Sequence, residues 1–181
     1  MKCAILSAVV PFLTATATAG IAAAAGASNG DQKFFQSVEG EWVGPGEIVA
    51  GKYKGTKFIC TFTGSSPEVK VGMTLDGSCR VGMFTQKMSA TVERSKKGYT
   101  GKFMDGAAGK GLDVVAGSVD GSRVVLSLNR NQLNGAMLAR LPDDNTMNVT
   151  VSVRVDEQMV PVIGMNLKRI DTSSVGSIAR E

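Results

Sequence analysis

Two cysteines are the residues of this sequence best suited to covalent chemistry. Cys60 and Cys79 would remain if Cys3 were removed with an N-terminal leader, and an even pair in an exported chain predicts one disulfide. The alternative is a reactive dithiol, which would need a Cys-x-x-Cys spacing or a nearby histidine, and the pair has neither. We therefore expect a Cys60–Cys79 bond that stabilises the fold.

Residues for acid–base or metal chemistry are scarce. The chain has no histidine, so Ser-His-Asp or Cys-His catalysis and histidine metal sites are excluded. The acidic pairs Asp143-Asp144 and Asp156-Glu157 stand in turn-forming sequence, where solvated turn formers are far commoner than a catalytic pair. The stretch Gly106–Gly111 lacks the spacing of a phosphate-binding loop. We expect no enzyme, no metal site and no cofactor.

The N-terminal segment, residues 1–27, is predicted to be a signal peptide. Lys2 supplies a positive start, Ala4–Ala25 carries no charge, and Ala25-Gly26-Ala27 offers the small-x-small pattern of a cleavage site. Cleavage is expected after Ala27, with Ala25 as the alternative. A membrane anchor would need about 20 strongly apolar residues, whereas this stretch is rich in alanine and threonine. We expect a periplasmic protein without an integral membrane span; secretion and outer-membrane association are the alternatives.

From Ser28 onward the chain is long enough for one ordinary domain. We expect a polar leader with a short helix over residues 28–39, a folded domain over residues 40–171 and a flexible tail over residues 172–181. The formal net charge is +4 at pH 7, with both signs spread along the chain and no basic patch with interleaved aromatics. We expect no nucleic-acid partner, and take the protein to be a monomer.

Short runs of alternating apolar and polar residues fill much of the chain. The runs are Phe58–Phe62, Val69–Leu75, Met88–Val92, Val124–Leu128 and Met147–Val155. Such alternation is typical of antiparallel strands with one apolar face. Turn-forming sequences separate the runs: Asp76-Gly77, Lys97-Gly98, Asp105-Gly106, Asp120-Gly121 and Pro142–Asn145.

This pattern predicts an all-β domain. A meander of about 8–10 antiparallel up-and-down strands has to close or stack, so we expect a β-barrel. Phe34, Phe35 and Val38 lie at helical spacing ahead of the strands and predict a short N-terminal helix.

A strand over Val69–Leu75 would conflict with the disulfide. It would place Cys60 and Cys79 two strands apart, at about 9.6 Å, which is beyond ordinary disulfide reach. The Gly-Ser-Ser-Pro sequence at residues 64–67 indicates an irregular connection. Either the disulfide closes at a frayed strand end or Val69–Leu75 is partly a loop, and we expect the second.

The first strand begins with a glycine-rich stretch that holds the only tryptophan of the chain. Gly40-Glu41-Trp42 resembles the Gly-x-Trp signature of lipocalins and their calycin relatives. With Gly44 and Gly46 it also resembles the G-x-W-x-G-x-G start of nitrobindin-like haem-binding barrels. The resemblance implies a calycin-like barrel in which Trp42 closes one end and an arginine of the last strand stacks across the indole.

Arg169 fits that arginine. It stands in phase with the apolar residues of the last predicted strand, which are Ile163, Met165 and Leu167. An inward arginine without a partner would be very costly, so we expect an indole face beneath it and carbonyls beside it. The sequence departs from its relatives in lacking the Thr-Asp-Tyr motif of many lipocalins. It also lacks the histidine through which nitrobindin-like barrels hold haem, so haem binding of that type is not expected.

Methionines are the last group of interest. Six of them can be placed on apolar phases and are candidates to line a cavity: Met73, Met83, Met88, Met137, Met147 and Met165. Methionine is pliable and fits irregular apolar space, so these residues either fill a small barrel or line an adaptable cavity.

Three functional hypotheses follow. The first is an exported periplasmic binding barrel for a small apolar or lipid-like ligand. The second is a filled barrel that contacts another envelope protein, in the manner of a protease inhibitor, and exposes an apolar patch such as Phe34 and Phe35. The third is an outer-membrane barrel, against which the strand charges and the scarcity of aromatics argue.

Overall fold

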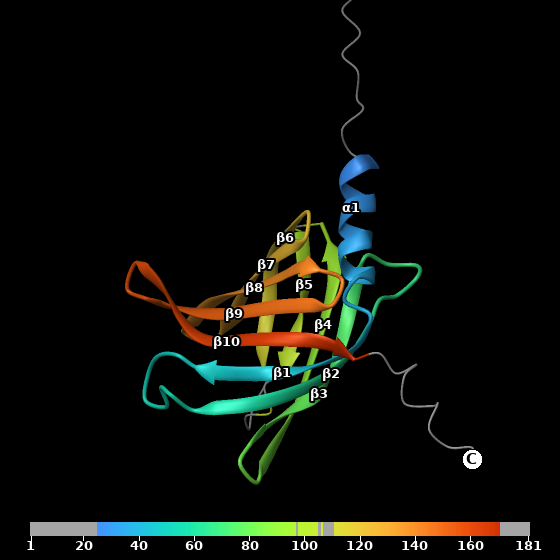
Figure 1. Cartoon of the computed structure of the whole chain (residues 1–181). Coiled ribbons are helices and arrows are strands. Elements are labelled where there is room, and N and C mark those ends of the chain that lie inside the picture. Colours follow the sequence, from blue (N-terminus) through green and yellow to red (C-terminus); the bar gives the residue numbers. More distant parts are fainter. Residues whose placement is uncertain (1–24, 97, 105, 107–110, 171–181) are drawn as a thin grey trace, which may run out of the picture.

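The computed structural model describes residues 25–96, 98–104, 106 and 111–170. This part of the chain consists of one helix and ten antiparallel strands: α1 (Ala25–Gln36), β1 (Gly40–Ile48), β2 (Lys57–Ser65), β3 (Gly72–Val81), β4 (Phe84–Ser95), β5 (Gly98–Met104), β6 (Leu112–Asp120), β7 (Arg123–Arg130), β8 (Leu133–Asp143), β9 (Thr146–Val155) and β10 (Gln158–Ile170). Each strand pairs with the next in sequence, and β10 pairs with β1 to close the barrel (Figure 1). The predicted all-β barrel with a short N-terminal helix is confirmed.

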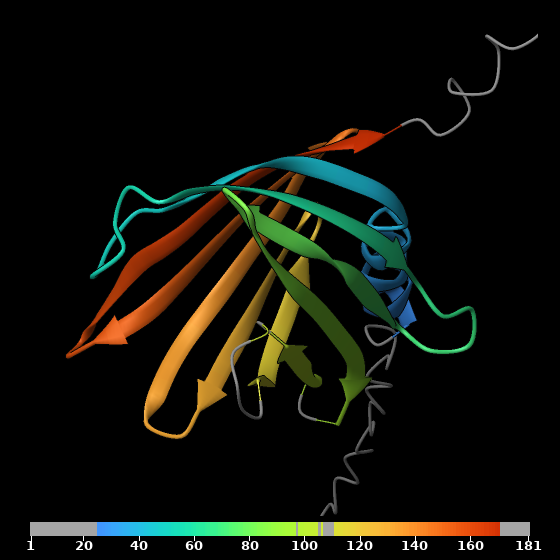
Figure 2. The same cartoon turned by 90° about the horizontal axis from the view of Figure 1, so that it is seen from below.

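The barrel has two unlike ends, because successive connections of an up-and-down barrel alternate between them. α1 and the β6–β7 and β8–β9 turns lie at one end, which we call the helix end (Figure 1). The β1–β2 loop and the β3–β4, β7–β8 and β9–β10 turns lie at the other, which we call the open end (Figures 1 and 2).

The apolar phase of the strands faces the barrel interior. On β2, Cys60 and Phe62 are buried, whereas Lys57, Thr61 and Thr63 are exposed. This orientation is the reverse of that in a lipid-facing barrel. In the described part of the chain, no helix is long and apolar enough to cross a membrane.

α1 plugs the helix end with aromatic side chains. Phe34, Phe35 and Val38 are all buried, and the Phe35 ring packs edge-on against that of Tyr99 with centroids 5.2 Å apart. The expectation that Phe34 and Phe35 would form an exposed docking patch is therefore wrong. Their helical spacing presents them to the barrel interior, so they complete the core.

α1 also extends further toward the N-terminus than predicted. It begins at Ala25, so residues 28–32, which were expected to form a polar leader, are helical. Asp31 lies in this added part of the helix and accepts hydrogen bonds from the side chains of Arg94 and Tyr99, which tie it to the barrel. The rest of the predicted signal peptide, residues 1–24, and the predicted flexible tail, residues 172–181, lie outside the described residues.

One of the predicted turns is wrong. Asp76-Gly77 lies inside β3, where the two residues pair with Thr63 and Phe62 of β2. The Asp120-Gly121 sequence does connect β6 to β7, and the β8–β9 turn follows Asp143. Asp143 accepts a hydrogen bond from the backbone N–H of Asn145 at 2.9 Å, which holds the pKa of its carboxyl below the usual range.

The disulfide joins two neighbouring strands. Cys60 on β2 lies directly opposite Cys79 on β3, with their Cα atoms 4.0 Å apart, and the two sulfurs are bonded. The separate strand over Val69–Leu75 does not exist: β3 begins at Gly72 and runs through to Val81. Residues 69–71 are a loop, as expected for part of this stretch, but the conflict disappears because Gly72–Leu75 and Cys79 lie on one strand.

Candidate ligand-binding cavity

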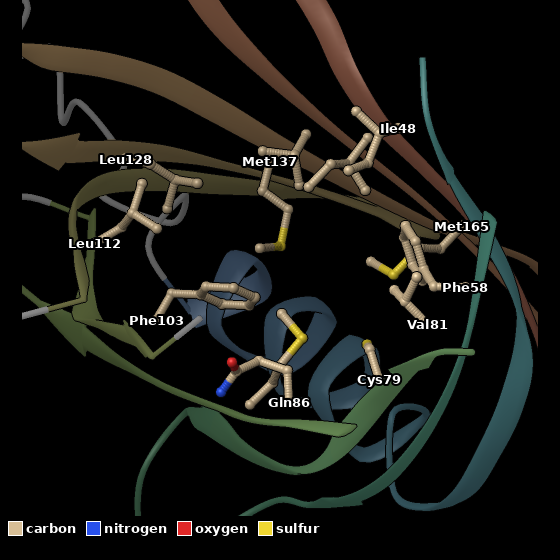
Figure 3. A pocket seen from close by; sticks show the side chains of 13 residues that line it. Ile48, Phe58, Cys79, Val81, Gln86, Phe103, Leu112, Leu128, Met137 and Met165 are labelled. Carbon is tan, nitrogen blue, oxygen red and sulfur yellow. The ribbon is translucent and has the colours of Figure 1, made fainter. Parts of the chain in front are cut away.

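The barrel interior is not filled. A cavity of about 200 Å³ lies in the part of the barrel nearer the open end. The residues around it are Ile48, Phe58, Cys79, Val81, Gln86, Met88, Phe103, Leu112, Leu128, Met137, Val151, Ile163 and Met165. Val81 and Gln86 are exposed as well as lining the cavity, so the space reaches the surface beside the β3–β4 turn. In Figure 3 the other labelled side chains surround the space, with α1 behind it.

A smaller hollow of about 40 Å³ lies deeper, toward the helix end. Phe103, Met137 and Met165 line both spaces and separate them. Figure 3 shows the Phe103 ring and the Met137 sulfur pointing into the interior in front of α1. Because a methionine side chain changes rotamer easily, Met137 and Met165 can adapt the larger space toward the smaller one.

Five of the six candidate methionines line these spaces. Met88, Met137 and Met165 lie around the larger cavity, and Met73 and Met147 around the deeper hollow. Met83 does not, because it lies in the β3–β4 turn and is 94 % exposed. β3 ends at Val81, and the alternation of strand faces ends with it, so the apolar phase assigned to Met83 is wrong.

Sulfur atoms form one side of the cavity. Cys79 lines it, and its partner Cys60 is fully buried, with Sγ 3.9 Å from Sδ of Met165. Gln86 supplies the polar group of the lining, and the remaining side chains offer no acid or base. Within the described residues, His, Cys, Asp and Glu side chains form no group of three or more that could hold a metal ion.

Gly46 of the glycine-rich start shapes the cavity wall. It pairs with Phe58 of β2 on one side and with Met165 of β10 on the other. A Cβ atom at this position would collide with the Phe58 ring and lie 2.8 Å from Cγ of Met165. The missing side chain therefore lets both residues point into the barrel at the same level.

Trp42 and Arg169 close the helix end. The Trp42 side chain is fully buried, and its Nε1–H donates to the carbonyl of Val38 at 2.8 Å. The Arg169 guanidinium carbon lies 4.3 Å from the centroid of the indole, as the sequence predicts. The guanidinium also donates to the carbonyl oxygens of Ser37, Glu39 and Asp144.

Gly40 makes this closure sterically feasible. Its φ of +104° is rarely adopted by other residues, and a Cβ there would lie 2.7 Å from Nη1 of Arg169. Arg169 therefore fastens β10 to β1, to the α1–β1 connection and to the β8–β9 turn. The three predicted closure residues lie together, and they position α1 over the interior.

A second polar contact holds α1 against the barrel. Asp31 accepts a hydrogen bond from the Tyr99 hydroxyl at 2.6 Å and one from Nη1 of Arg94 at 2.9 Å. Burial, followed by the hydrogen bond to Asp31, raises the pKa of Tyr99 well above its ordinary value. Sequence reasoning missed this cluster, because Asp31 stands 63 and 68 residues before Arg94 and Tyr99 along the chain and none of the three stands in a motif.

The Tyr99 contact should make stability fall in alkaline solution. The folded state favours the neutral phenol, so this contribution is present below about pH 10, where an unfolded tyrosine ionises, and is lost as pH rises further. Tyr99→Phe should lower the free energy of unfolding by about 1–2 kcal/mol at pH 7. The difference between the two proteins, measured by urea unfolding, should shrink above pH 10. A constant difference from pH 7 to 11 would contradict the assignment.

No family model matches the sequence, and no curated protein is significantly similar to it. Among solved structures, the chain is similar to a protein of unknown function of the DUF3598 family from Nostoc punctiforme, with a TM-score of 0.48 and 14 % identity over 75 % of this chain and 49 % of the other. The chain thus spans about half the length of that protein. A likeness at this level carries no argument about function.

Proposed function

We propose that the protein is an exported, calycin-type binding barrel of the periplasm that holds one small apolar or lipid-like molecule. The observation that supports this most strongly is the apolar space of about 200 Å³ left in an otherwise packed interior and reaching the surface at the open end. The mouths of β-barrels are common places for such ligands. The lining points to binding without catalysis, because Gln86 is its polar member and is not ionisable.

The size of the cavity indicates the size of the ligand. A dry apolar cavity of about 150 Å³ accommodates benzene, whereas drug-sized ligands need about 300 Å³ or more. A space of about 200 Å³, with an adjoining 40 Å³ behind movable methionines, fits a molecule of roughly ten non-hydrogen atoms. The Gln86 amide can hydrogen-bond a hydroxyl or carbonyl at the mouth, which favours a medium-chain amphiphile over a pure hydrocarbon.

The disulfide and the N-terminal sequence support export. A buried Cys60–Cys79 bond is typical of oxidising compartments, and the first 27 residues match a signal peptide. The predicted cleavage positions Ala25 and Ala27 fall at the start of α1. Cleavage after Ala27 would leave Asp31 in the mature chain, so the contacts of α1 with the barrel would be preserved.

The alternative function is protein interaction at the open end. Met83 and Phe84 in the β3–β4 hairpin are 94 % and 81 % exposed, which is unusual for side chains of this size. A filled barrel that presents these residues to an envelope protein would not need the cavity. The two functions can therefore be distinguished by experiment, because only a ligand-binding barrel should bind a small molecule and lose it when the cavity is blocked.

A pair of matched substitutions tests the cavity. Val151 lines it, whereas Val125 lies on the outer face of β7 and is 37 % exposed. Val151→Phe should weaken binding of 1-octanol, measured by isothermal titration calorimetry, by about tenfold or more, because the larger side chain occupies the space. Val125→Phe should bind as the unchanged protein does. Equal affinities for the two variants, with both folded by circular dichroism, would remove the basis of the proposal.

A further inference from the structure

Exposed apolar side chains gather at the open end of the barrel. Met83 and Phe84 stand at the tip of the β3–β4 hairpin, and Tyr53 in the β1–β2 loop is 63 % exposed. The two connections extend from adjacent strands, because β2 pairs with β3 near these ends through Ile59 and Arg80. Large apolar side chains with such high exposed fractions, gathered in one region, are typical of a contact surface.

Basic side chains surround these apolar ones. The β1–β2 connection and the start of β2 carry Lys52, Lys54 and Lys57, all exposed. The β3–β4 hairpin adds Arg80 and Lys87, also exposed. We call these five residues, with Tyr53, Met83 and Phe84, the open-end patch.

The charge of the rim is unevenly distributed. Glu47 is the acidic residue of β1 closest to the patch, and the β9–β10 turn carries the acidic pair Asp156-Glu157 next to Arg154, while Arg130 ends β7 at the same rim. The β1–β2 and β3–β4 connections, with five exposed basic residues, are therefore the more basic side of the rim. A surface that combines protruding apolar side chains with lysines and an arginine complements an anionic lipid surface.

The open-end patch also borders the cavity. Val81 and Gln86, which line the cavity, flank Met83 and Phe84 in the same hairpin. A membrane in contact with the hairpin tip would thus lie next to the mouth. A lipid-like ligand could pass between bilayer and barrel over a few residues of apolar surface.

We propose that the open-end patch docks the protein on an anionic membrane surface. Met83 and Phe84 enter the headgroup region, and the five basic residues contact lipid phosphates. Docking itself rests on the exposed side chains, and only the passage of ligand from the bilayer rests on the proposed function.

Vesicle sedimentation tests the docking. The purified protein should bind phosphatidylcholine vesicles that contain about 40 % phosphatidylglycerol at least about tenfold more tightly than pure phosphatidylcholine vesicles. Each lysine near an anionic surface contributes about fivefold or less to binding. The double substitution Lys52→Gln with Lys54→Gln should therefore reduce binding to the anionic vesicles by about tenfold. Met83→Ser with Phe84→Ser should abolish detectable binding to both types of vesicle.

The helix end provides a matched control. Val69 is 95 % exposed there, and Lys96 is exposed in the connection between β4 and β5. Val69→Ser with Lys96→Gln changes the same kinds of side chain and should leave vesicle binding unchanged. Equal binding to both vesicle types, no binding, or equal losses in the patch and control variants would overturn the proposal.

Docking and ligand binding can fail separately. Met83→Ser with Phe84→Ser leaves the cavity lining intact, so this variant should bind 1-octanol in solution as the unchanged protein does. If the unchanged protein bound 1-octanol but no vesicles, the docking proposal alone would be overturned. Vesicle binding without octanol binding would leave docking in place and contradict the proposed function.

Discussion

Replacing Trp42 with alanine should lower the free energy of unfolding by about 3–5 kcal/mol, the range typical of a fully buried aromatic residue. The substitution removes the indole from the helix end and the hydrogen bond to the Val38 carbonyl. It also leaves the Arg169 guanidinium above an empty space, although its carbonyl partners remain. Urea unfolding followed by circular dichroism measures the change, since the variant has no tryptophan fluorescence.

A conservative variant separates the parts of this effect. Trp42→Phe keeps an aromatic face beneath Arg169 but cannot donate to Val38, so the loss should be clearly smaller than for alanine. A double-mutant cycle with Arg169→Ala should give a coupling of about 1–2 kcal/mol for the stacked pair. If Trp42→Ala changed stability by less than about 1 kcal/mol, the helix end would not be closed by this residue.

The second large effect concerns the disulfide. Cys60→Ala with Cys79→Ala should lower the free energy of unfolding by about 3 kcal/mol, as the chain-entropy model gives for a sequence separation of 19. Reduction of the unchanged protein should give a loss of similar size, which controls for the sulfur bulk removed from the interior. The measurement is urea unfolding with and without reductant. If neither the double substitution nor reduction changed the free energy of unfolding by more than about 0.5 kcal/mol, the bond would not stabilise the fold.

Alkylation provides an independent check on the same bond. The protein unfolded without reductant should take up no alkylating agent at Cys60 or Cys79, and should take up two equivalents after reduction. Free thiols in protein purified from the periplasm would contradict both the bond and the argument for export that depends on it.

The sequence predicts the barrel well because local patterns carry the information. Alternation such as that of Phe58–Phe62 fixes which side chains face inward, and Asp120-Gly121 supplies the positive φ of a real turn. Trp42 and Arg169 could be paired because the Gly-x-Trp resemblance implies an arginine stacked on the indole, and Arg169 stands in the inward phase of the last strand. Local sequence patterns mislead where pairing with a neighbouring strand determines the structure. Asp76-Gly77 has the residue types of a turn, but it continues β3 because it pairs with β2.

The site is harder to predict from the sequence than the fold. Inward phase identifies Met88, Met137 and Met165 as cavity candidates, but whether the barrel is filled depends on the summed side-chain volumes around ten strands. Met83 could not be placed by phase, because the alternation of strand faces stops where β3 ends at Val81.

Contacts between distant segments are the other gap. The cluster of Asp31, Arg94 and Tyr99 depends on the packing of α1 against the barrel, and the open-end patch depends on the pairing of β2 with β3. Neither has a local signature in the sequence. Both could be recognised only once the register of the strands was known.

Native mass spectrometry of the protein, purified without detergent and then mixed with 1-octanol, shows whether the barrel holds a ligand. We expect one copy of the chain carrying one small-molecule adduct, either retained from the cell or formed with octanol. The adduct should be lost in Val151→Phe and kept in Val125→Phe. A protein that stays free of adduct, or an adduct that survives equally in both variants, would contradict a ligand held inside the barrel.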